Sequence, residues 1–389
     1  MKNEGYTTFY AGKYLNQYGM DSVGGLSHIP PGWDSWIGLK GNSVYYNYTL
    51  SINGTPIFHS DDPQEDYLTN IIKDEGVKFI QETSGSSSPF FMMLSAPACH
   101  DPITPEPKYE QSLLDLQIPE TNNFNIANGE DKNWFVRLGE QPLKDNVIED
   151  IEEMYRNRLR TLMSVDDMIE AVVQALDDQN NLNNTYIFFT SDNGYHLGQF
   201  SLAKDKREPY EFDIRVPLMV RSPGIEEGVQ IESVATNIDL APTFLDLAGI
   251  SVPNSMDGMS LKNFILGMDV SSERTILIEH TGEGSQDVNS GCEYLGTGLA
   301  YCLPELDCKC QDALNNTYSC LRTLGNGKNE KFCKWNDDEQ FEEYYDIGSD
   351  PYELNNEVNN LNNSYYDNLE NSLNYMVNCS GNECLNIYK

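Results

Sequence analysis

The chain has 389 residues, with 61 acidic against 25 basic side chains and a formal net charge of −36. A surface this acidic repels other polyanions, so nucleic acid is excluded as a partner of the surface as a whole. Hydrophobic residues make up 39% and aromatic residues 11%, which is enough for a buried core and argues against disorder. No run of about eighteen apolar residues occurs, so the sequence predicts no insertion into a membrane.

The first part of the chain predicts loops around short strands. Residues 1–60 are rich in glycine, proline and aromatic residues, and His28–Trp33 is expected to form a rigid loop. The apolar run Pro89–Leu94 predicts a buried strand. Residues 101–147 are polar and rich in proline and asparagine, which predicts a long surface excursion near the site.

The middle of the chain alternates helix and strand signals. From Ile148 the apolar residues recur at steps of three or four, which predicts a long amphipathic helix with one face on a sheet. Strands are expected at 186–190 and 216–221, the first of them buried and parallel, and a helix at 238–249. Alternation of this kind is typical of the α/β class.

The strand at 186–190 runs directly into Ser191-Asp192-Asn193-Gly194. Ligands bind at the carboxyl ends of strands in open α/β sheets, so Asp192 and Asn193 would lie at the mouth of a site. A carboxylate beside an amide carbonyl offers two hard oxygens, which suit Ca²⁺ or Mg²⁺ better than Zn²⁺. Taken alone, Asp-Asn-Gly is more often a plain turn.

The composition changes past Gly267. A strand is expected at 275–279. Residues 354–378 contain many asparagines and are interpreted as a loosely ordered segment or a weak helix.

Eight of the nine cysteines lie in this last part of the chain. They are Cys292, Cys302, Cys308, Cys310, Cys320, Cys333, Cys379 and Cys384, while Cys99 stands apart beside His100. An even cluster with irregular spacing predicts disulfides of open connectivity. Zinc is the alternative, but only Cys308-Lys309-Cys310 comes near the paired spacing that a zinc site needs.

Asn-x-Ser/Thr sequons point to the same cellular compartment as the cysteines. The candidate glycosylation sites are Asn47, Asn53, Asn183, Asn315, Asn362 and Asn378. Sequons and disulfides together favour the secretory pathway. The acidic net charge is consistent with a lysosome, where partial protonation of carboxylates eases self-repulsion.

Several long motifs in the same order resemble the sulfatase family, most closely its N-acetylglucosamine-6-sulfatase branch. They lie at Gly5–Asn16, Tyr45–Gly54, Leu162–Asp167, Thr190–Gly224 and the cysteine-rich tail through Tyr318. The resemblance implies an alkaline-phosphatase-like α/β fold, a mostly parallel sheet flanked by helices. A smaller disulfide-rich C-terminal α+β subdomain would follow, with a catalytic domain over residues 1–267 and the subdomain over 268–389.

The resemblance also implies roles for individual residues. Asp192 and Asn193 correspond to calcium ligands, and His196 is expected to face the sugar. Lys13 matches the lysine that bridges the nucleophile and sulfate. His100 matches a histidine that contacts sulfate and the leaving oxygen, and Lys206 matches a second sulfate-binding lysine, with Lys204 as its rival. His28, His59 and His280 match no motif and are interpreted as structural.

The expected function is removal of the 6-sulfate from N-acetylglucosamine units of heparan or keratan sulfate in lysosomes or after secretion. Family members begin with an aspartate pair and a Cys-x-Pro-Ser-Arg motif whose cysteine becomes formylglycine, and this sequence contains neither. Either the sequence is incomplete or the nucleophile is lost, so the chain as written is expected to be inactive. The alternatives are a catalytically dead glycoprotein that binds sulfated glycans and an extracellular heparan endosulfatase.

Overall fold

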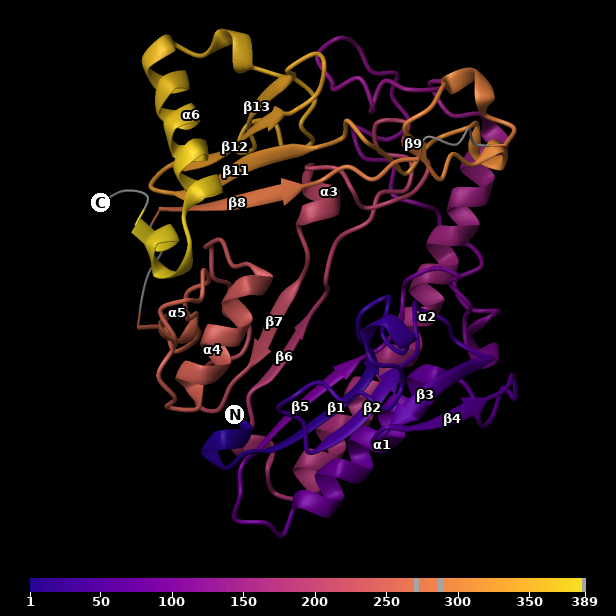
Figure 1. The fold of residues 1–389 in the computed structure, drawn as a ribbon, viewed down its shortest axis with the longest axis vertical. Coiled ribbons are helices and arrows are strands. Elements are labelled where there is room, and N and C mark those ends of the chain that lie inside the picture. The colour runs from indigo at the N-terminus through magenta and orange to yellow at the C-terminus, as the bar shows by residue number, and fades with distance from the viewer. Residues whose placement is uncertain (269–272, 286–289, 387–389) are drawn as a thin grey trace. The chain divides into compact units, whose positions relative to one another are not determined.

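The computed structural model describes residues 1–268, 273–285 and 290–386 (Figure 1). The chain divides into two compact units. The first comprises Met1–Ile118 and Glu152–Tyr186, and the second comprises Pro119–Ile151 and Ile187–Lys389. This division follows contact density, and the sequence-based boundary at residue 267 stays a prediction.

The first unit is built on a five-stranded mixed sheet in the order β4-β3-β2-β1-β5. Its strands are β1 (Thr7–Lys13), β2 (Ser35–Leu39), β3 (Tyr48–Ile52), β4 (Thr55–His59) and β5 (Phe90–Ser95). Strand β1, next to the edge strand β5, runs parallel to both β2 and β5, whereas β3 and β4 continue the sheet as antiparallel strands. Helix α1 (Leu68–Thr83) packs on β1 and β5, where Phe9 stacks on Phe79 with ring centroids 4.8 Å apart.

The long amphipathic helix is confirmed as α2 (Asp145–Asp178), which has 34 residues. Its buried side chains recur at steps of three or four, as Val165, Met168, Val172 and Leu176 show. This spacing keeps one face of the helix apolar between Val165 and Leu176.

The second unit contains a four-stranded antiparallel sheet in the order β13-β12-β11-β8. The strands are β8 (Arg274–His280), β11 (Tyr318–Gly325), β12 (Lys328–Trp335) and β13 (Glu342–Asp346). Two small sheets pair β6 (Ile187–Thr190) with β7 (Leu218–Arg221) and β9 (Leu299–Ala300) with β10 (Asp312–Ala313). The helices are α3 (Glu211–Ile214), α4 (Leu240–Leu247), α5 (Lys262–Ile265) and α6 (Asn363–Asn378).

Short 3₁₀ turns connect these elements. They are Lys2–Glu4, Asp21–Val23, Pro107–Tyr109, Leu182–Asn184, Asn237–Asp239, Glu293–Leu295, Pro304–Leu306, Val358–Asn360 and Gly381–Asn386. In the part of the chain that the structure describes, no helix combines the length and apolarity that crossing a bilayer requires.

The α/β class is confirmed, but the predicted environment of two strands is wrong. Strand β6 pairs antiparallel with β7 and all of its residues are partly exposed, whereas a buried parallel strand was expected. Strand β5 is parallel to β1 but lies at the edge of the sheet and is also partly exposed. A short apolar run fits both environments, and tertiary packing selects the partner.

Two segments are better ordered than the sequence indicated. Helix α6, which lies beside the four-stranded sheet in Figure 1, is regular and begins at the N-cap Asn362. It packs Leu369, Leu373 and Met376 against Leu321 and Phe332. The polar stretch 101–147 is not wholly a surface excursion, because its residues 132–136 are largely buried. Hydrogen bonds to distant acidic side chains, such as Asn133 Nδ2 to Asp337 Oδ2 at 2.9 Å, compensate for this burial.

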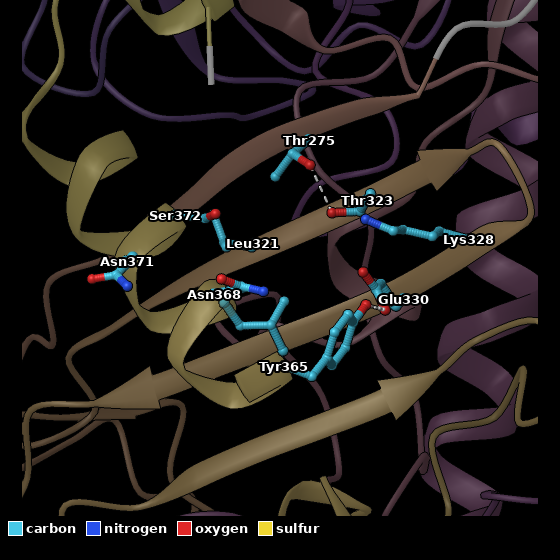
Figure 2. Close-up of a pocket in the computed structure, with 10 residues that line it drawn as sticks. Thr275, Leu321, Thr323, Lys328, Glu330, Tyr365, Asn368, Asn371 and Ser372 are labelled. Atoms are coloured by element: carbon cyan, nitrogen blue, oxygen red, sulfur yellow. Dashed lines mark hydrogen bonds between the residues drawn. The ribbon is translucent and has the colours of Figure 1, made fainter. Parts of the chain in front are cut away.

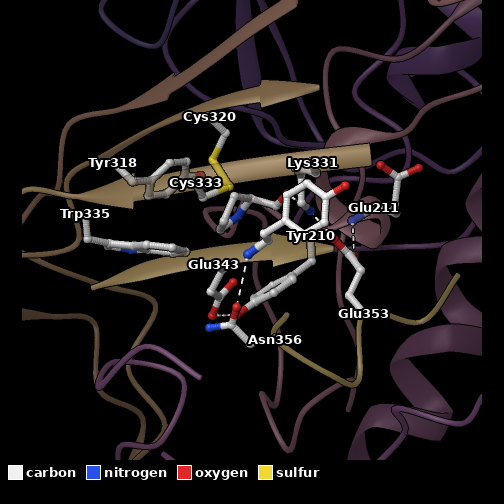
Figure 3. The surroundings of a disulfide bond; sticks show 12 residues. Tyr210, Glu211, Tyr318, Cys320, Lys331, Cys333, Trp335, Glu343, Glu353 and Asn356 are labelled. Atoms are coloured by element: carbon white, nitrogen blue, oxygen red, sulfur yellow. Dashed lines mark hydrogen bonds and ion pairs between the residues drawn. A yellow bond between two sulfur atoms is a disulfide. The ribbon is translucent and has the colours of Figure 1, made fainter. Parts of the chain in front are cut away.

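All eight C-terminal cysteines pair, so the disulfide prediction is confirmed and the zinc alternative is wrong. The four bonds join Cys292 to Cys308, Cys302 to Cys310, Cys320 to Cys333 and Cys379 to Cys384. Figure 3 shows Cys320–Cys333 linking the neighbouring strands β11 and β12.

Candidate active site

Lys13 is the last residue of β1 and is placed by an unusually close backbone contact. A Cβ on Gly12 would lie 2.0 Å from the Ser95 carbonyl oxygen of β5, so only glycine allows the two strands to approach this closely. The Lys13 Nζ donates to Asn16 Oδ1 at 2.6 Å, and the buried Tyr10 hydroxyl donates to the Lys13 carbonyl. Lys13 is therefore held at the carboxyl end of β1.

His100 lies in the turn that follows β5, the neighbour of β1. Its Nδ1 is 2.8 Å from the Asp101 carbonyl, which can only accept, so Nδ1 carries a proton and Nε2 is left for a ligand. The Tyr45 hydroxyl holds the His100 carbonyl at 3.0 Å. Because β1 and β5 are parallel, Lys13 and His100 lie at the same edge of the first unit's sheet, as strand-end sites require.

Asp192 and Asn193 follow β6 in the second unit and are held mainly through the backbone. The Asn237 side chain donates to the carbonyls of Ser191 and Asp192 at 3.0 and 3.3 Å. Gly194 continues the turn with its amide on the Asp213 carbonyl at 2.7 Å. The Asp192 carboxylate is exposed, and Asn193 Nδ2 donates to the Gly194 carbonyl, which leaves the amide oxygen as an acceptor.

The chemistry of these donors fits calcium. Asp192 and Asn193 offer hard oxygens, but Ca²⁺ takes about six to eight, so the two residues form only part of a coordination shell. Among the described residues, no group of three or more His, Cys, Asp or Glu side chains is arranged to hold a metal. A calcium role for this pair stays a prediction.

Lys206 lies between two anchored residues in the loop after His196. The backbones of His196 and Asp205 bond to each other, with His196 N to Asp205 O at 2.8 Å. The Arg207 guanidinium lies 2.6 Å from the Asp205 carboxylate. Lys204 and Lys206 are both partly exposed, so burial does not decide between these two rivals.

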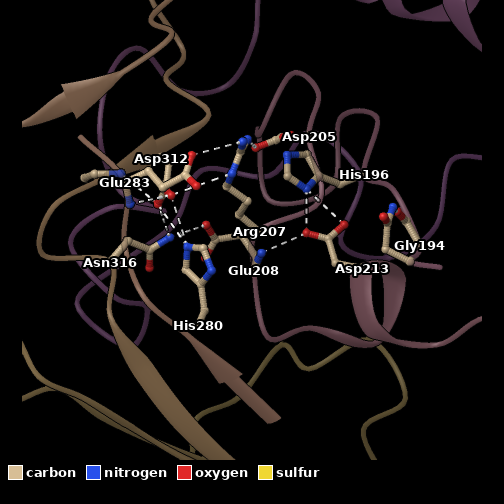
Figure 4. Close-up of polar contacts among 12 residues, drawn as sticks. Gly194, His196, Asp205, Arg207, Glu208, Asp213, His280, Glu283, Asp312 and Asn316 are labelled. Atoms are coloured by element: carbon tan, nitrogen blue, oxygen red, sulfur yellow. Dashed lines mark hydrogen bonds and ion pairs between the residues drawn. The ribbon is translucent and has the colours of Figure 1, made fainter. Parts of the chain in front are cut away.

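His196 is only 4% exposed, and its Nδ1 is 2.9 Å from Asp213 Oδ2 (Figure 4). The imidazole is thus bonded within the protein, and contact with a sugar stays a prediction. His59 and His280 each pair with a carboxylate, Asp66 and Asp312, in agreement with a structural role.

The structure brings the predicted residues together in two groups, one within each unit. Lys13 and His100 share an edge of the first sheet, while Asp192, Asn193, His196 and Lys206 share the loops after β6. Convergence of the two groups on one cation stays a prediction. The six sequon asparagines are all exposed, as glycan attachment requires, and their modification is likewise a prediction.

Sequence reasoning missed the buried charges that support the second group. Lys331 is fully buried, pairs with Glu353 and donates to the Pro209 carbonyl at the start of α3 (Figure 3). Glu353 also accepts from the Glu211 amide at 2.8 Å. Burial raises the pKa of the neighbouring Glu343 carboxyl to about 7. The bonds of Lys331 to Pro209 and of Glu353 to Glu211 span 122 and 142 positions, so no local signal reveals them.

A separate cavity of about 350 Å³ lies between α6 and the four-stranded sheet (Figure 2). Its lining is mostly polar and includes Thr323, Glu330 and Tyr365, with the Tyr365 hydroxyl bonded to Glu330. Thr323 and Glu330 face α6, whereas Lys331, next along β12, points to the other face, as strand alternation requires. The cavity is therefore distinct from the α3 side of this sheet.

Comparisons with known proteins agree with these features. Residues 1–250 match the family model named Sulfatase. The chain is 44% identical over 382 residues to the N-acetylglucosamine-6-sulfatase of Bos taurus, covering 98% of this chain and 68% of that protein. It is 40% identical over 270 residues to the extracellular sulfatase SULF-1 homolog of Drosophila melanogaster, covering 68% of this chain but 23% of that protein.

Solved structures show the same fold at low sequence identity. A protein solved in complex with its substrate D-glucosamine-2-N,6-O-disulfate has a TM-score of 0.73 at 22% identity, covering 97% of this chain and 79% of that one. A 2-O glycosaminoglycan sulfatase has a TM-score of 0.62 at 17% identity, covering 99% of this chain and 76% of that one. From the family match and the high identity to its members, we conclude that this chain belongs to the sulfatase family.

Proposed function

We propose that this protein is a sulfuric ester hydrolase that removes the 6-sulfate from N-acetylglucosamine units of heparan or keratan sulfate. The observation that supports this most is the 44% identity, over 98% of the chain, to an N-acetylglucosamine-6-sulfatase. Similarity over 98% of the chain extends to both units, which supports carrying over the substrate class along with the fold.

The site residues suit the hydrolysis of a sulfate ester. Asp192 and Asn193 would hold part of a Ca²⁺ shell, and the ion would supply charge that polarises the sulfuryl oxygens. Lys13 and Lys206 would place positive charge beside those oxygens. His100, as an imidazolium with Nδ1 bonded to the Asp101 carbonyl, would donate its Nε2 proton to the leaving sugar oxygen. The family's formylglycine would supply the attacking group, and these 389 residues contain no Cys-x-Pro-Ser-Arg motif to form it.

The proposed compartment is the lysosome or the extracellular space. Four disulfides and six exposed sequon asparagines support passage through an oxidising secretory pathway. The similarity to an extracellular sulfatase over 68% of the chain supports an endosulfatase as the second candidate. An enzyme of that kind would release sulfate from within a long chain, whereas the first candidate would act on a terminal 6-sulfated residue.

The test is sulfate release from a terminally 6-sulfated oligosaccharide by the protein as its native cells make it. Replacing Lys206 by alanine should lower kcat/KM by about 10²-fold or more, the usual cost of losing one such charged contact. Lys204→Ala is the matched control and should change kcat/KM by no more than a few-fold. Removal of calcium by a chelator should abolish turnover, and its re-addition should restore it.

Three results would contradict this proposal. Unchanged turnover of the Lys206 variant, with loss in the Lys204 variant, would transfer the sulfate-binding role to Lys204. Release from internal positions alone would favour the endosulfatase. Binding of sulfated glycans without any turnover by the native protein would leave the non-catalytic glycan-binding protein as the function.

A further inference from the structure

The loop that carries Lys206 rests on a buried cluster of acidic side chains (Figure 4). Its four carboxylates come from the loop itself, from α3 and from β10, and each residue is at most 5% exposed. They are Asp205, Glu208, Asp213 and Asp312. Such a concentration of buried negative charge is unfavourable unless every carboxylate is paired or uncharged.

Three of the four carboxylates have a histidine or arginine partner. Asp213 lies 2.9 Å from His196 Nδ1, and Asp312 lies 3.1 Å from His280 Nε2. The Arg207 guanidinium lies 2.6 Å from Asp205 and also approaches Asp312 at 3.7 Å. Each aspartate therefore has a nitrogen partner within the cluster.

Glu208 is the exception. It is 1% exposed, its Oε1 accepts only the amide of Asn316 at 3.0 Å, and its Oε2 is buried without a hydrogen-bond partner. No cation contacts its carboxyl group among the described residues. The Glu208 backbone amide donates to Asp213 Oδ2 at 3.0 Å, which ties the residue to the same cluster.

The groups that face Glu208 favour its uncharged form. Burial is the largest cause that raises the pKa of Glu208 well above its usual range. The nearby negative charges of Asp213, Asp312 and Asp205 raise this pKa further. The remaining neighbours of Glu208 are the phenols of Tyr210 and Tyr318. The side chains of Arg207, His196 and His280 contact the aspartates of the cluster instead of Glu208. A proton on Glu208 removes the one charge that the cluster leaves unpaired.

This cluster also determines where Lys206 sits. Asp205 and Arg207 flank Lys206 and bond each other, and Asp205 is joined through its backbone to His196. The Arg207 carbonyl accepts the Tyr318 hydroxyl at 3.0 Å, which fastens the other side of the loop to β11. A disturbance at Glu208 would reach Lys206 through these two neighbours.

We propose that Glu208 is a positioning residue that holds the Lys206 loop in place as an uncharged acid, so that the loop is ordered at acidic pH and loosens as the pH rises. The consequence for the sulfatase rests on the proposed role of Lys206, whereas the behaviour of the loop does not. This pH dependence of the loop would suit a protein that works in an acidic compartment.

The direction of the pH effect follows from proton binding. A carboxyl whose pKa is raised on folding binds more protons in the folded state than in the unfolded state. Its stabilising effect is complete below the unfolded value of 4.5 and is lost as the pH rises towards the folded value. His196 and His280 also contact the aspartates of this cluster, so a variant must isolate Glu208.

The experiment is hydrogen exchange of the whole protein at about pH 5 and about pH 7.5, corrected for intrinsic exchange rates. In the wild type, amides of residues 205–213 should lose protection by about tenfold or more at the higher pH, the effect of one pKa unit. Glu208→Gln, uncharged at both values, should keep protection at both. Glu227→Gln, on an exposed loop of the same unit, is the control and should behave as the wild type.

Two outcomes would overturn the proposal: wild-type protection in residues 205–213 that does not depend on pH, or a dependence that Glu208→Gln retains. If Glu208→Gln does not fold, Glu208→Met, also uncharged and of similar length, replaces it with the same expectation. Failure of either kind would leave the sulfate-release test of Lys206→Ala untouched, so the two proposals fail separately.

Discussion

The single replacement Asp239→Asn tests how the loop of the proposed metal ligands is supported. Asp239 is 0% exposed, and its two oxygens lie 2.7 and 2.8 Å from the Arg274 guanidinium. They also accept the backbone amides of Thr236 and Met259, both at 2.8 Å. The residue thus closes the turn Asn237–Asp239, which begins α4 and carries the side chain that holds Ser191 and Asp192.

In the Asp239→Asn variant an amide nitrogen replaces one carboxylate oxygen, so a hydrogen-bond donor faces other donors. The variant also leaves the Arg274 guanidinium without its negative partner. Breaking one side of a buried ion pair costs about 3–5 kcal/mol, so the free energy of unfolding should fall by that amount. Asp246→Asn is the matched control on α4: its side chain is 38% exposed and 3.0 Å from Lys262, and its loss should cost about 1 kcal/mol or less.

Urea unfolding followed by near-ultraviolet circular dichroism measures both variants. Equal losses would refute the argument that burial and bond number make Asp239 the stronger support. Asn237→Ala, which removes only the bonds to Ser191 and Asp192, should weaken calcium binding with a stability loss near 1 kcal/mol. Unchanged calcium affinity in the Asn237→Ala variant would show that this turn does not support the proposed metal site.

Two further predictions concern the disulfides and the isolated polypeptide. Without reductant, mass spectrometry after alkylation should show none of the eight C-terminal cysteines labelled, and any labelling would show an open bridge. Replacing both Cys320 and Cys333 by alanine should lower the free energy of unfolding by about 2–4 kcal/mol, and no loss would count against a stabilising bridge. Expressed alone, these 389 residues should show no sulfatase turnover, because no residue can become the nucleophile, whose loss typically costs about 10⁴–10⁶ in rate. An upstream segment with the aspartate pair and Cys-x-Pro-Ser-Arg should restore it, and robust turnover without that segment would refute the assigned chemistry.

Local patterns predicted the elements well. The three- and four-residue steps from Ile148 onward located α2, and apolar runs located β5, β6 and β8. Helix α6 was underrated because asparagine is a poor helix former, yet Leu369, Leu373 and Met376 already lie on one face. Tertiary packing of that face outweighs the propensity.

Motifs were sufficient to nominate the site residues, since Lys13, His100 and Asp192 all follow strands at positions where α/β sheets bind ligands. Their supports were not visible. Asn237 reaches the Asp192 loop from 45 positions away, and Asn316 reaches Glu208 from 108. Bonds between such distant positions leave no periodic trace in the sequence.

The sequence by itself determined the α/β class, the sulfatase family, the position of most helices and strands and the presence of a cysteine framework, because each depends on local spacing or on a contiguous motif. Tertiary structure alone decided that β6 pairs antiparallel, which cysteines join and that Glu208 is buried with no cation at its carboxyl group among the described residues. Strand pairing, disulfide geometry and desolvation are properties of segments that meet only after the chain folds, so they cannot be read from neighbours along it.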